Sequence, residues 1–219
     1  SGAYKGMKLS ELWEKHPELF GDTGMDRFPL LVKIIDAKDD LSIQVHPDDA
    51  YAKAHENGSL GKTECWFILD CKENATLVVG HNAKTKEELE QMIHEGRWKE
   101  FIREIPIKPG DFIQIDPGTV HAIKGGTLLL ETQQSSDITY RVYDYDRLSN
   151  GKPRQLHIVQ SIDVITVPAK SADNSVVHIE KKDDAIQQLI QCPYYTVYRI
   201  DVEHRVETWQ DKPFVLMSV

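Results

Sequence analysis

The chain has 219 residues, of which 40% are hydrophobic and 28% are charged, with 13 glycines and 10 prolines. This composition is typical of a globular protein with a core, and it excludes collagen-like, low-complexity and disordered chains. The formal charge of −9 repels a phosphate backbone, so nucleic acid is not expected as a partner. No run approaches the ~20 apolar residues that cross a bilayer. We expect a soluble cytoplasmic protein with no membrane partner.

Short apolar or alternating runs, separated by Gly, Asn, Asp or Pro turns, predict β-strands along most of the chain. In chain order the strands expected before residue 144 are 28–36, 41–46, 64–70, 76–79, 111–116, 127–132 and 138–143. Short strands at this density indicate a mainly β sandwich or barrel.

Helices are expected as insertions. A short one is predicted over 10–16, and a second over 48–56 has Asp48 at its cap. A third insertion over 85–103 opens with a capping box at Thr85–Glu88 and carries an apolar stripe behind it. We expect this insertion to form a lid or side wall.

The composition turns polar from residue 168 to 184, before strand patterns resume at 194–202 and 214–219. We therefore expect a first domain over 1–168, a linker over 169–189 and a partial second domain over 190–219. The chain starts without Met, and its last residues form an apolar strand pattern with nothing after it. We expect a fragment of a longer protein.

Polar and apolar side chains alternate in residues 41–46. The alternation puts Ser42, Gln44 and His46 on the same strand face. Taken alone, such a pattern is more often the solvated face of an antiparallel sheet than a site.

Two further segments favour a metal site. Lys62 and Glu64 share a strand face, and His121 closes a turn at residues 116–121. Together with Gln44 and His46 they offer two imidazoles, one carboxylate and one amide, which leave a divalent ion a net positive charge and Lewis acidity. These ligands suit zinc, and they also accept iron, manganese or nickel. Cys65 alternates with Glu64, so it is expected to point away from the metal into a core.

Residues 110–121 resemble the second motif of the cupins, which are small β-barrels that hold a metal between two sheets. The first cupin motif is matched loosely, because Gln44-x-His46 replaces His-x-His and the carboxylate Glu64 comes much later. This order of ligands, Gln-x-His, a distant Lys-x-Glu and then Gly-x-x-His, is similar to that of the type I phosphomannose isomerases. Residues 128–145 look like the short bacterial branch of that family.

The resemblance, which spans residues 28–154, implies a cupin (jelly-roll) barrel with short helical insertions, followed by the start of a second, incomplete β domain. It implies an isomerase that interconverts mannose 6-phosphate and fructose 6-phosphate through an ene-diol. Zn²⁺ would be the cofactor and a phosphorylated hexose the substrate. The isolated fragment of such an enzyme can be inactive, and the oligomeric state stays open.

The resemblance also implies the site residues. The zinc ligands would be Gln44, His46, Glu64 and His121; the catalytic residues Arg141, Lys62, Glu131 and Asp137; and the substrate-binding residues Ser42, Lys62 and Arg141. Strand parity supports the grouping, because Glu131 shares a face with Gln133, and Asp137 shares one with Arg141.

Several roles stay open. Either Glu131 or Asp137 could be the base, and Lys62 could relay a proton or bind the phosphate. The phosphate needs positive charge, and the candidates are Lys62, Lys124, Arg141, Arg147 and Arg154.

Four alternatives compete with these assignments. Asp137 and Arg141 could be an exposed ion pair, and Lys62 an edge-strand lysine. The protein could be a non-catalytic cupin-fold sugar-phosphate binding or accessory protein, although such a protein would not need Glu131, Asp137 and Arg141 together. It could also be a metal-dependent oxygenase of the cupin group, which would need a redox metal.

Overall fold

The computed structural model describes residues 2–171 and 176–219, which divide into two compact units. The larger unit contains residues 30–181 and 188–197, and the smaller one contains residues up to 29, 182–187 and 198–219. Residues 172–175 of the expected linker lie outside the described residues, and the division of the chain at residues 168 and 190 stays a prediction.

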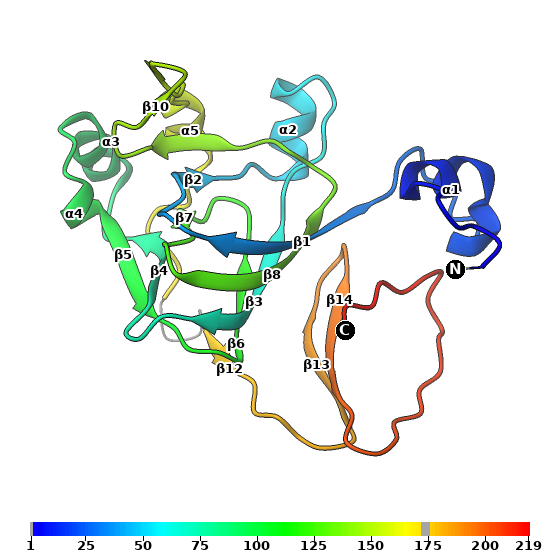
Figure 1. The fold of residues 1–219 in the computed structure, drawn as a ribbon. Coiled ribbons are helices and arrows are strands. Elements are labelled where there is room, and N and C mark those ends of the chain that lie inside the picture. The colour runs from blue at the N-terminus through cyan, green and yellow to red at the C-terminus, as the bar shows by residue number, and fades with distance from the viewer. Residues whose placement is uncertain (1, 172–175) are drawn as a thin grey trace. The chain divides into compact units, whose positions relative to one another are not determined.

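Two five-stranded antiparallel sheets build the larger unit (Figure 1). The first sheet has the order β1 (Leu30–Ala37), β8 (Thr127–Gln134), β3 (Glu64–Cys71), β6 (Asp111–Ile115) and β12 (Val177–His178). The second has the order β5 (Ile102–Pro106), β4 (Thr76–His81), β7 (His121–Ala122), β2 (Ile43–Val45) and β9 (Tyr140–Tyr143). The seven strands expected before residue 144 are all present, shifted by at most two residues at either end. The mainly β prediction is confirmed.

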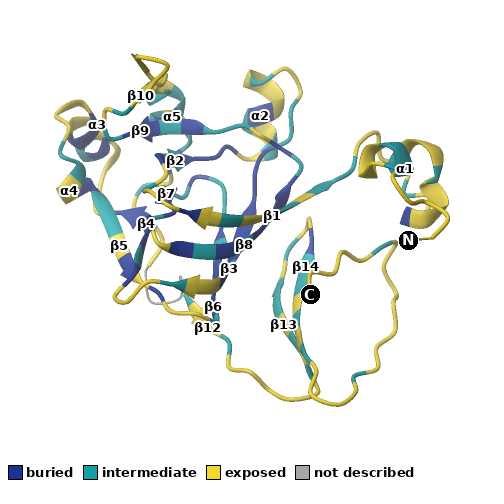
Figure 2. Ribbon diagram, viewed as in Figure 1, coloured by how far each residue is buried: buried dark blue, intermediate teal, exposed yellow. Residues whose placement is uncertain are grey.

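The inner faces of the two sheets meet in an apolar core. It includes Trp66 and Ile68 of β3, Leu77 of β4, Ile113 of β6 and Leu129 of β8, all completely buried. Figure 2 shows buried residues concentrated in these strands, whereas the small hairpin of β10 (Leu148–Ser149) and β11 (Lys152–Pro153) is exposed. Burial of each large apolar side chain contributes roughly 1.5–3 kcal/mol, so this core fixes the spacing between the two sheets.

Helices cover the outer face of the second sheet. Leu89 and Met92 of α3 (Lys86–His94) and Phe101 of α4 (Trp98–Phe101) pack with Val78 and Val142 of the sheet. Thr85 caps α3 as predicted, because its Oγ1 accepts a hydrogen bond from the backbone N–H of Glu88. The capping box is incomplete, because the Glu88 carboxylate accepts from the backbone N–H of Lys84 at 2.6 Å instead of that of Thr85. No described helix has the length and apolarity to cross a membrane.

The remaining helices of the larger unit are α2 (Asp49–His55) and α5 (Ile158–Val164). Asp48 caps α2 by accepting a hydrogen bond from Tyr51 N–H at 2.8 Å, as expected. The helix α5 has no counterpart among the sequence predictions. The predicted insertion over 85–103 is wrong at its end, because α4 stops at Phe101 and β5 begins at Ile102, where it pairs with β4.

A hairpin of β13 (Ala185–Gln191) and β14 (Thr196–Asp201) follows the polar segment. Only its second strand was expected. Its residues 188–197 belong to the larger unit, where Leu189 and Tyr195 join Cys65 and Phe112 in a cluster on the outer face of the first sheet. The predicted orientation of Cys65, away from Glu64, is therefore confirmed.

The smaller unit has an aromatic cluster in place of a sheet core. Trp13 of α1 (Leu9–Lys15), Phe20 of the 3-10 turn Pro17–Phe20, Phe28 and Phe214 contact one another at ring-centroid separations of 5.0 to 6.4 Å. The strand expected over 214–219 is wrong, because these residues pair with no strand among the described residues and form none themselves. An apolar pattern makes a strand only where a neighbouring strand supplies hydrogen bonds.

Candidate metal centre

Side chains from both sheets meet at one place between them. Gln44 on β2 lies opposite His121 on β7 and opposite Arg141 on β9, so these three project from the same face of the second sheet. Glu64, the first residue of β3, projects from the first sheet on the same face as the core residue Trp66. The predicted ligands are thus brought together by pairing between strands that are far apart in the sequence.

His46, Glu64 and His121 form a tight buried cluster. One ligand atom from each lies within 4.8 Å of the others. His46 Nε2 is 3.5 Å from Glu64 Oε2, and His121 Nε2 is 3.4 Å from Glu64 Oε1. This is the only such group of His, Cys, Asp and Glu side chains in the part of the chain that the structure describes.

Both histidines are oriented by their other ring nitrogen. His46 Nδ1 donates to the carbonyl of Ile138 at 2.8 Å, and His121 Nδ1 donates to the carbonyl of Thr119 at 2.9 Å. Each Nε2 therefore presents a lone pair to the cluster, which is how metal-binding histidines are commonly held. Both oxygens of Glu64 are buried, and no described residue gives either one a hydrogen bond of regular geometry. A space lined by lone pairs and an unsatisfied carboxylate fits a bound cation.

The protonation states of the cluster are also those of metal ligands. Burial lowers the pKa of His46 to about 4, although Glu64 opposes the change. Burial likewise lowers the pKa of His121. Burial by itself would raise the pKa of Glu64, but His46, which is protonated only in acid, and Lys62 outweigh it and hold that pKa well below its ordinary value. Both imidazoles are neutral and the carboxylate is ionised, as ligation requires.

Gln44 and Lys62 complete the surroundings of the cluster. Gln44 Nε2 lies 3.2 Å from His121 Nε2, and the other amide orientation would present Oε1 there as a ligand. Ser42 donates to Gln44 Oε1 at 3.4 Å, which confirms that these two polar residues lie on one side of the strand. Lys62 Nζ lies 2.9 Å from Glu64 Oε2 and 3.2 Å from His46 Nε2. Because the Lys62 side chain is only 7% exposed, the edge-strand alternative for it is wrong.

Glu131 lies on the inner face of β8, close to this cluster. Its Oε2 accepts a hydrogen bond from Trp66 Nε1 at 3.1 Å. The Trp66 and His121 rings pack edge to face, with their centroids 5.5 Å apart. Its Oε1 accepts one from Lys33 Nζ at 2.8 Å, and the same ammonium donates to Gln133 Oε1 at 2.5 Å. Sequence reasoning missed Lys33. The only local signal was a lysine within the apolar run 30–35 of β1.

Known proteins resemble the whole chain. A mannose-6-phosphate isomerase of Bacillus subtilis, ManA, is 54% identical over 220 aligned residues, which cover 100% of this chain and 70% of that protein. The chain belongs to the type I phosphomannose isomerase family. The family's catalytic-domain model matches residues 1–67. A mannose-6-phosphate isomerase of Streptococcus mutans is 49% identical and covers 100% of this chain and 69% of its own length.

The fold agrees with that membership. The crystal structure of the mannose 6-phosphate isomerase from Bacillus subtilis superposes with a TM-score of 0.86 at 49% identity, over 97% of this chain and 68% of that one. The expected cupin barrel is therefore confirmed, and the catalytic reading is favoured over a non-catalytic binding protein.

The structure gives this phosphomannose isomerase a cluster of arginines beside the metal centre. Asp144 is buried just after β9. Its carboxylate accepts hydrogen bonds from Arg154 Nη2 at 2.5 Å, Arg154 Nε at 2.6 Å and Arg147 Nη2 at 2.5 Å. Burial, with Arg154 and Arg147 nearby, lowers the pKa of Arg141. Three guanidiniums against one carboxylate leave surplus positive charge here. Lys124, another phosphate candidate, pairs instead with Glu104 at 2.7 Å.

Asp137 differs from expectation. It is exposed and precedes β9, which begins at Tyr140, so the argument that Asp137 and Arg141 share a strand face is wrong. The alternative of an exposed ion pair between these two described residues is wrong as well, because the charged groups near Arg141 are Arg154, Asp144 and Arg147 and not Asp137. Arg141 instead donates from Nη1 to the carbonyl of Gln155 at 2.8 Å, and its buried Nε has no hydrogen-bond partner in the described part of the chain. A catalytic role for Asp137 stays a prediction.

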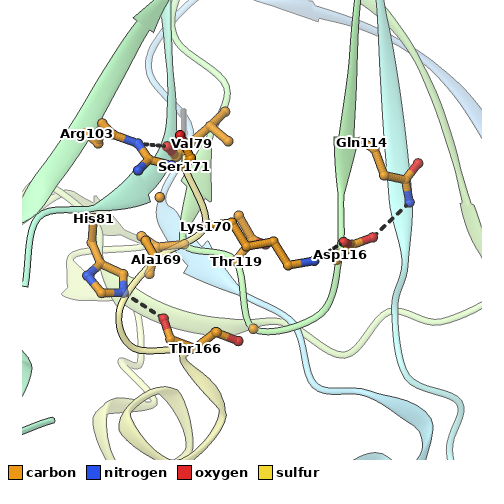
Figure 3. A pocket seen from close by; sticks show the side chains of 13 residues that line it. Val79, His81, Arg103, Gln114, Asp116, Thr119, Thr166, Ala169, Lys170 and Ser171 are labelled. Carbon is orange, nitrogen blue, oxygen red and sulfur yellow. Dashed lines mark hydrogen bonds and ion pairs between the residues drawn. The ribbon is translucent and has the colours of Figure 1, made fainter. Parts of the chain in front are cut away.

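A separate cavity of about 290 Å³ opens near the ends of β4 and β6 (Figure 3). Its polar groups are engaged by one another: His81 Nε2 donates to the carbonyl of Thr166 at 2.9 Å, and Lys170 Nζ donates to Asp116 at 2.5 Å. None of the predicted metal ligands is among its described lining residues. The metal centre and this cavity are therefore distinct features.

Proposed function

We propose that this chain is the catalytic part of a zinc-dependent isomerase that interconverts mannose 6-phosphate and fructose 6-phosphate. The observation that carries the proposal is the buried Glu64 carboxylate between two neutral imidazoles, which receives no regular hydrogen bond from any described residue. Lys62 lies beside it, and Arg141 lies opposite the predicted ligand Gln44 on the neighbouring strand. Family membership supports the same reading. A cytoplasmic location is part of the proposal, because a charged hexose phosphate does not cross a bilayer unaided.

The metal would be held by Gln44, His46, Glu64 and His121. Two imidazoles, one carboxylate and an amide oxygen suit zinc. A divalent ion at this place would supply positive charge to substrate oxygens as they become negative. The rest of the chemistry belongs to side chains of this chain.

The reaction moves one hydrogen between neighbouring carbons. A base removes the proton from C2 of the aldose, the C1 oxygen gains a proton, and an ene-diol forms. The C2 oxygen then gives up its proton and C1 receives one, which leaves the ketose with no net change in atoms or electrons. The residues must hold a base near C2 and C1 and stabilise the negative oxygens.

We assign the base to Glu131. Its carboxylate is buried on the inner face of β8 and is fixed by Trp66 on one oxygen and Lys33 on the other. Asp137 is exposed and precedes its strand, so it is the weaker candidate. A carboxylate held at both oxygens keeps one orientation, which a proton transfer between adjacent carbons requires.

Lys62 and Arg141 act on the substrate oxygens. The Lys62 ammonium is buried within reach of the ligand cluster, so it is placed to pass a proton between O2 and O1. The Arg141 guanidinium keeps its charge throughout and stabilises the anionic ene-diol from the second sheet. Ser42, buried beside Gln44, completes the substrate-binding group.

We assign the phosphate to Arg147 and Arg154. Their side chains are 36% and 39% exposed, so a ligand can reach them, and they adjoin Arg141. Paired guanidiniums bind a phosphate dianion through several charge-assisted hydrogen bonds. Asp144 holds the two arginines together without neutralising both.

A coupled assay on the whole protein tests the proposal. We expect fructose 6-phosphate to be formed from mannose 6-phosphate after loading with zinc, and solvent hydrogen to enter C1 when the reaction is run in deuterium oxide. Glu64→Gln, prepared identically, controls for a contaminating isomerase. Substrate binding without turnover by the metal-loaded protein would support the non-catalytic alternative instead.

A further inference from the structure

The segment 154–157 lies along the free edge of β9. It connects the hairpin of β10 and β11 to α5, and β9 is the last strand of the second sheet. At this edge the backbone N–H of His157 donates to the carbonyl of Arg141 at 2.8 Å. The backbone N–H of Arg141 donates to His157 Nδ1 at 3.2 Å. One residue therefore satisfies both backbone groups of Arg141 on the side away from β2.

The same segment also holds the Arg141 side chain. Arg141 Nη1 donates to the carbonyl of Gln155 at 2.8 Å. On its other side, Arg141 lies opposite Gln44 of β2. The main chain of Arg141 thus lies between the predicted metal ligand Gln44 and His157. Its guanidinium is hydrogen-bonded to Gln155, in the same segment as His157.

The bond from Arg141 N–H requires a lone pair on His157 Nδ1, so the ring must be neutral with its proton on Nε2. Partial burial and the neighbouring Arg141 charge lower the pKa of His157, while Glu56 opposes them. The Tyr140 hydroxyl donates a hydrogen bond to Glu56. The centroids of the Tyr140 and His157 rings are 6.2 Å apart. A neutral imidazole adds no like charge beside the guanidinium.

We propose that His157 is a positioning residue for Arg141. Its Nδ1 and backbone N–H fix the point on β9 from which the guanidinium reaches the substrate. The inference rests on the proposed function, because the part assigned to Arg141 is the stabilisation of the ene-diol. A displacement of a stabilising charge by about 1 Å is enough to lower a rate substantially.

Two polar variants test the role of Nδ1. In His157→Asn the amide oxygen reaches the place of Nδ1, whereas in His157→Gln the amide lies one methylene farther out, near the place of Nε2. We expect His157→Asn to keep kcat within about threefold and His157→Gln to lose roughly tenfold or more, with metal content and unfolding temperature alike in both. Equal kcat values in the two variants would overturn the inference.

A double-mutant cycle then asks whether His157 acts through Arg141. In an Arg141→Ala background, His157→Gln is expected to cost no further kcat, because the group it positions is gone. An undiminished loss in that background would overturn the inference and assign His157 a role of its own. A wild-type protein that binds metal but has no isomerase activity would overturn the proposed function, and this inference with it.

Discussion

Asp144→Asn probes the arginine cluster directly. The substitution keeps the shape of the side chain but removes its charge and points an amide N–H₂ at a guanidinium. Three hydrogen bonds from Arg154 and Arg147, at 2.5 to 2.6 Å, lose their charged acceptor. Each such bond contributes about 1.5–3 kcal/mol when buried, but the two arginines are 36% and 39% exposed and solvent screens them. We therefore expect a loss of about 2–3 kcal/mol in the free energy of unfolding near neutral pH.

The sign of the pH dependence follows from the pKa of Asp144. Hydrogen bonds from Arg154, then Arg147, lower that pKa below its ordinary value, although burial opposes them. A lowered folded-state pKa stabilises the protein above the unfolded pKa of about 3.9, and this stabilisation is lost as the pH falls through the folded pKa. The difference between wild type and Asp144→Asn is expected to stay constant above about pH 5 and to shrink below about pH 4.

Urea unfolding at several pH values measures this difference. Asp146→Asn is the matched control in the same loop, because Asp146 is exposed and its only side-chain hydrogen bond with a described residue is the one it accepts from the Tyr143 hydroxyl, at 3.2 Å. We expect the control to change stability by less than about 0.5 kcal/mol. The reasoning is refuted if Asp144→Asn unfolds like the control at neutral pH, or if its deficit persists undiminished in acid.

Other expected outcomes concern the site itself. Arg141→Ala should lower kcat by roughly a hundredfold or more with metal content unchanged, and an increase confined to KM would make Arg141 a ground-state binder. Glu64→Gln should abolish tight binding of a divalent ion, as measured by metal analysis after dialysis, and retention of one ion per chain would contradict the ligand assignment. Burial raises the pKa of the Cys65 thiol to about 12. In the native protein a thiol reagent should therefore modify Cys65 far more slowly than Cys192, whereas after unfolding it should modify both at an equal rate.

The candidate metal ligands are assigned by the resemblance to a family motif, and alternation within a strand supports their grouping because it is a local property. Ser42 contacts Gln44 and Lys62 contacts Glu64, as parity predicts, although Ser42 and Lys62 each lie just before the strand itself. Parity failed at Asp137, because the strand that would carry it starts only at Tyr140. Where a strand begins depends on its partner, and β9 pairs with β2, about a hundred residues away in sequence.

Lys33 shows what local patterns cannot reveal. It lies in a strand of mostly apolar residues, where a lysine side chain is expected to point into solvent. Nothing in the sequence of β1 indicates that it has a buried partner. Its partner Glu131 lies on β8, and the register of Lys33 opposite Glu131 places the two side chains on one face. The end of the predicted helix over 85–103 failed for a similar reason, because Ile102 continues the apolar stripe of the helix but pairs with His81 in a sheet.

The distribution of charge explains why so many ionisable groups are tolerated inside this barrel. A single buried charge is costly, and these charges have partners of opposite sign: Lys62 contacts Glu64, Lys33 on β1 contacts Glu131 on β8, and Asp144 joins two arginines. Glu64 differs from the rest, since no residue in the described part of the chain gives its oxygens a regular hydrogen bond, although Lys62 is close. Hydrophobic packing of the two sheets sustains this unsatisfied group, and a divalent ion would relieve it. Metal binding is therefore expected to stabilise the fold as well as to serve the reaction.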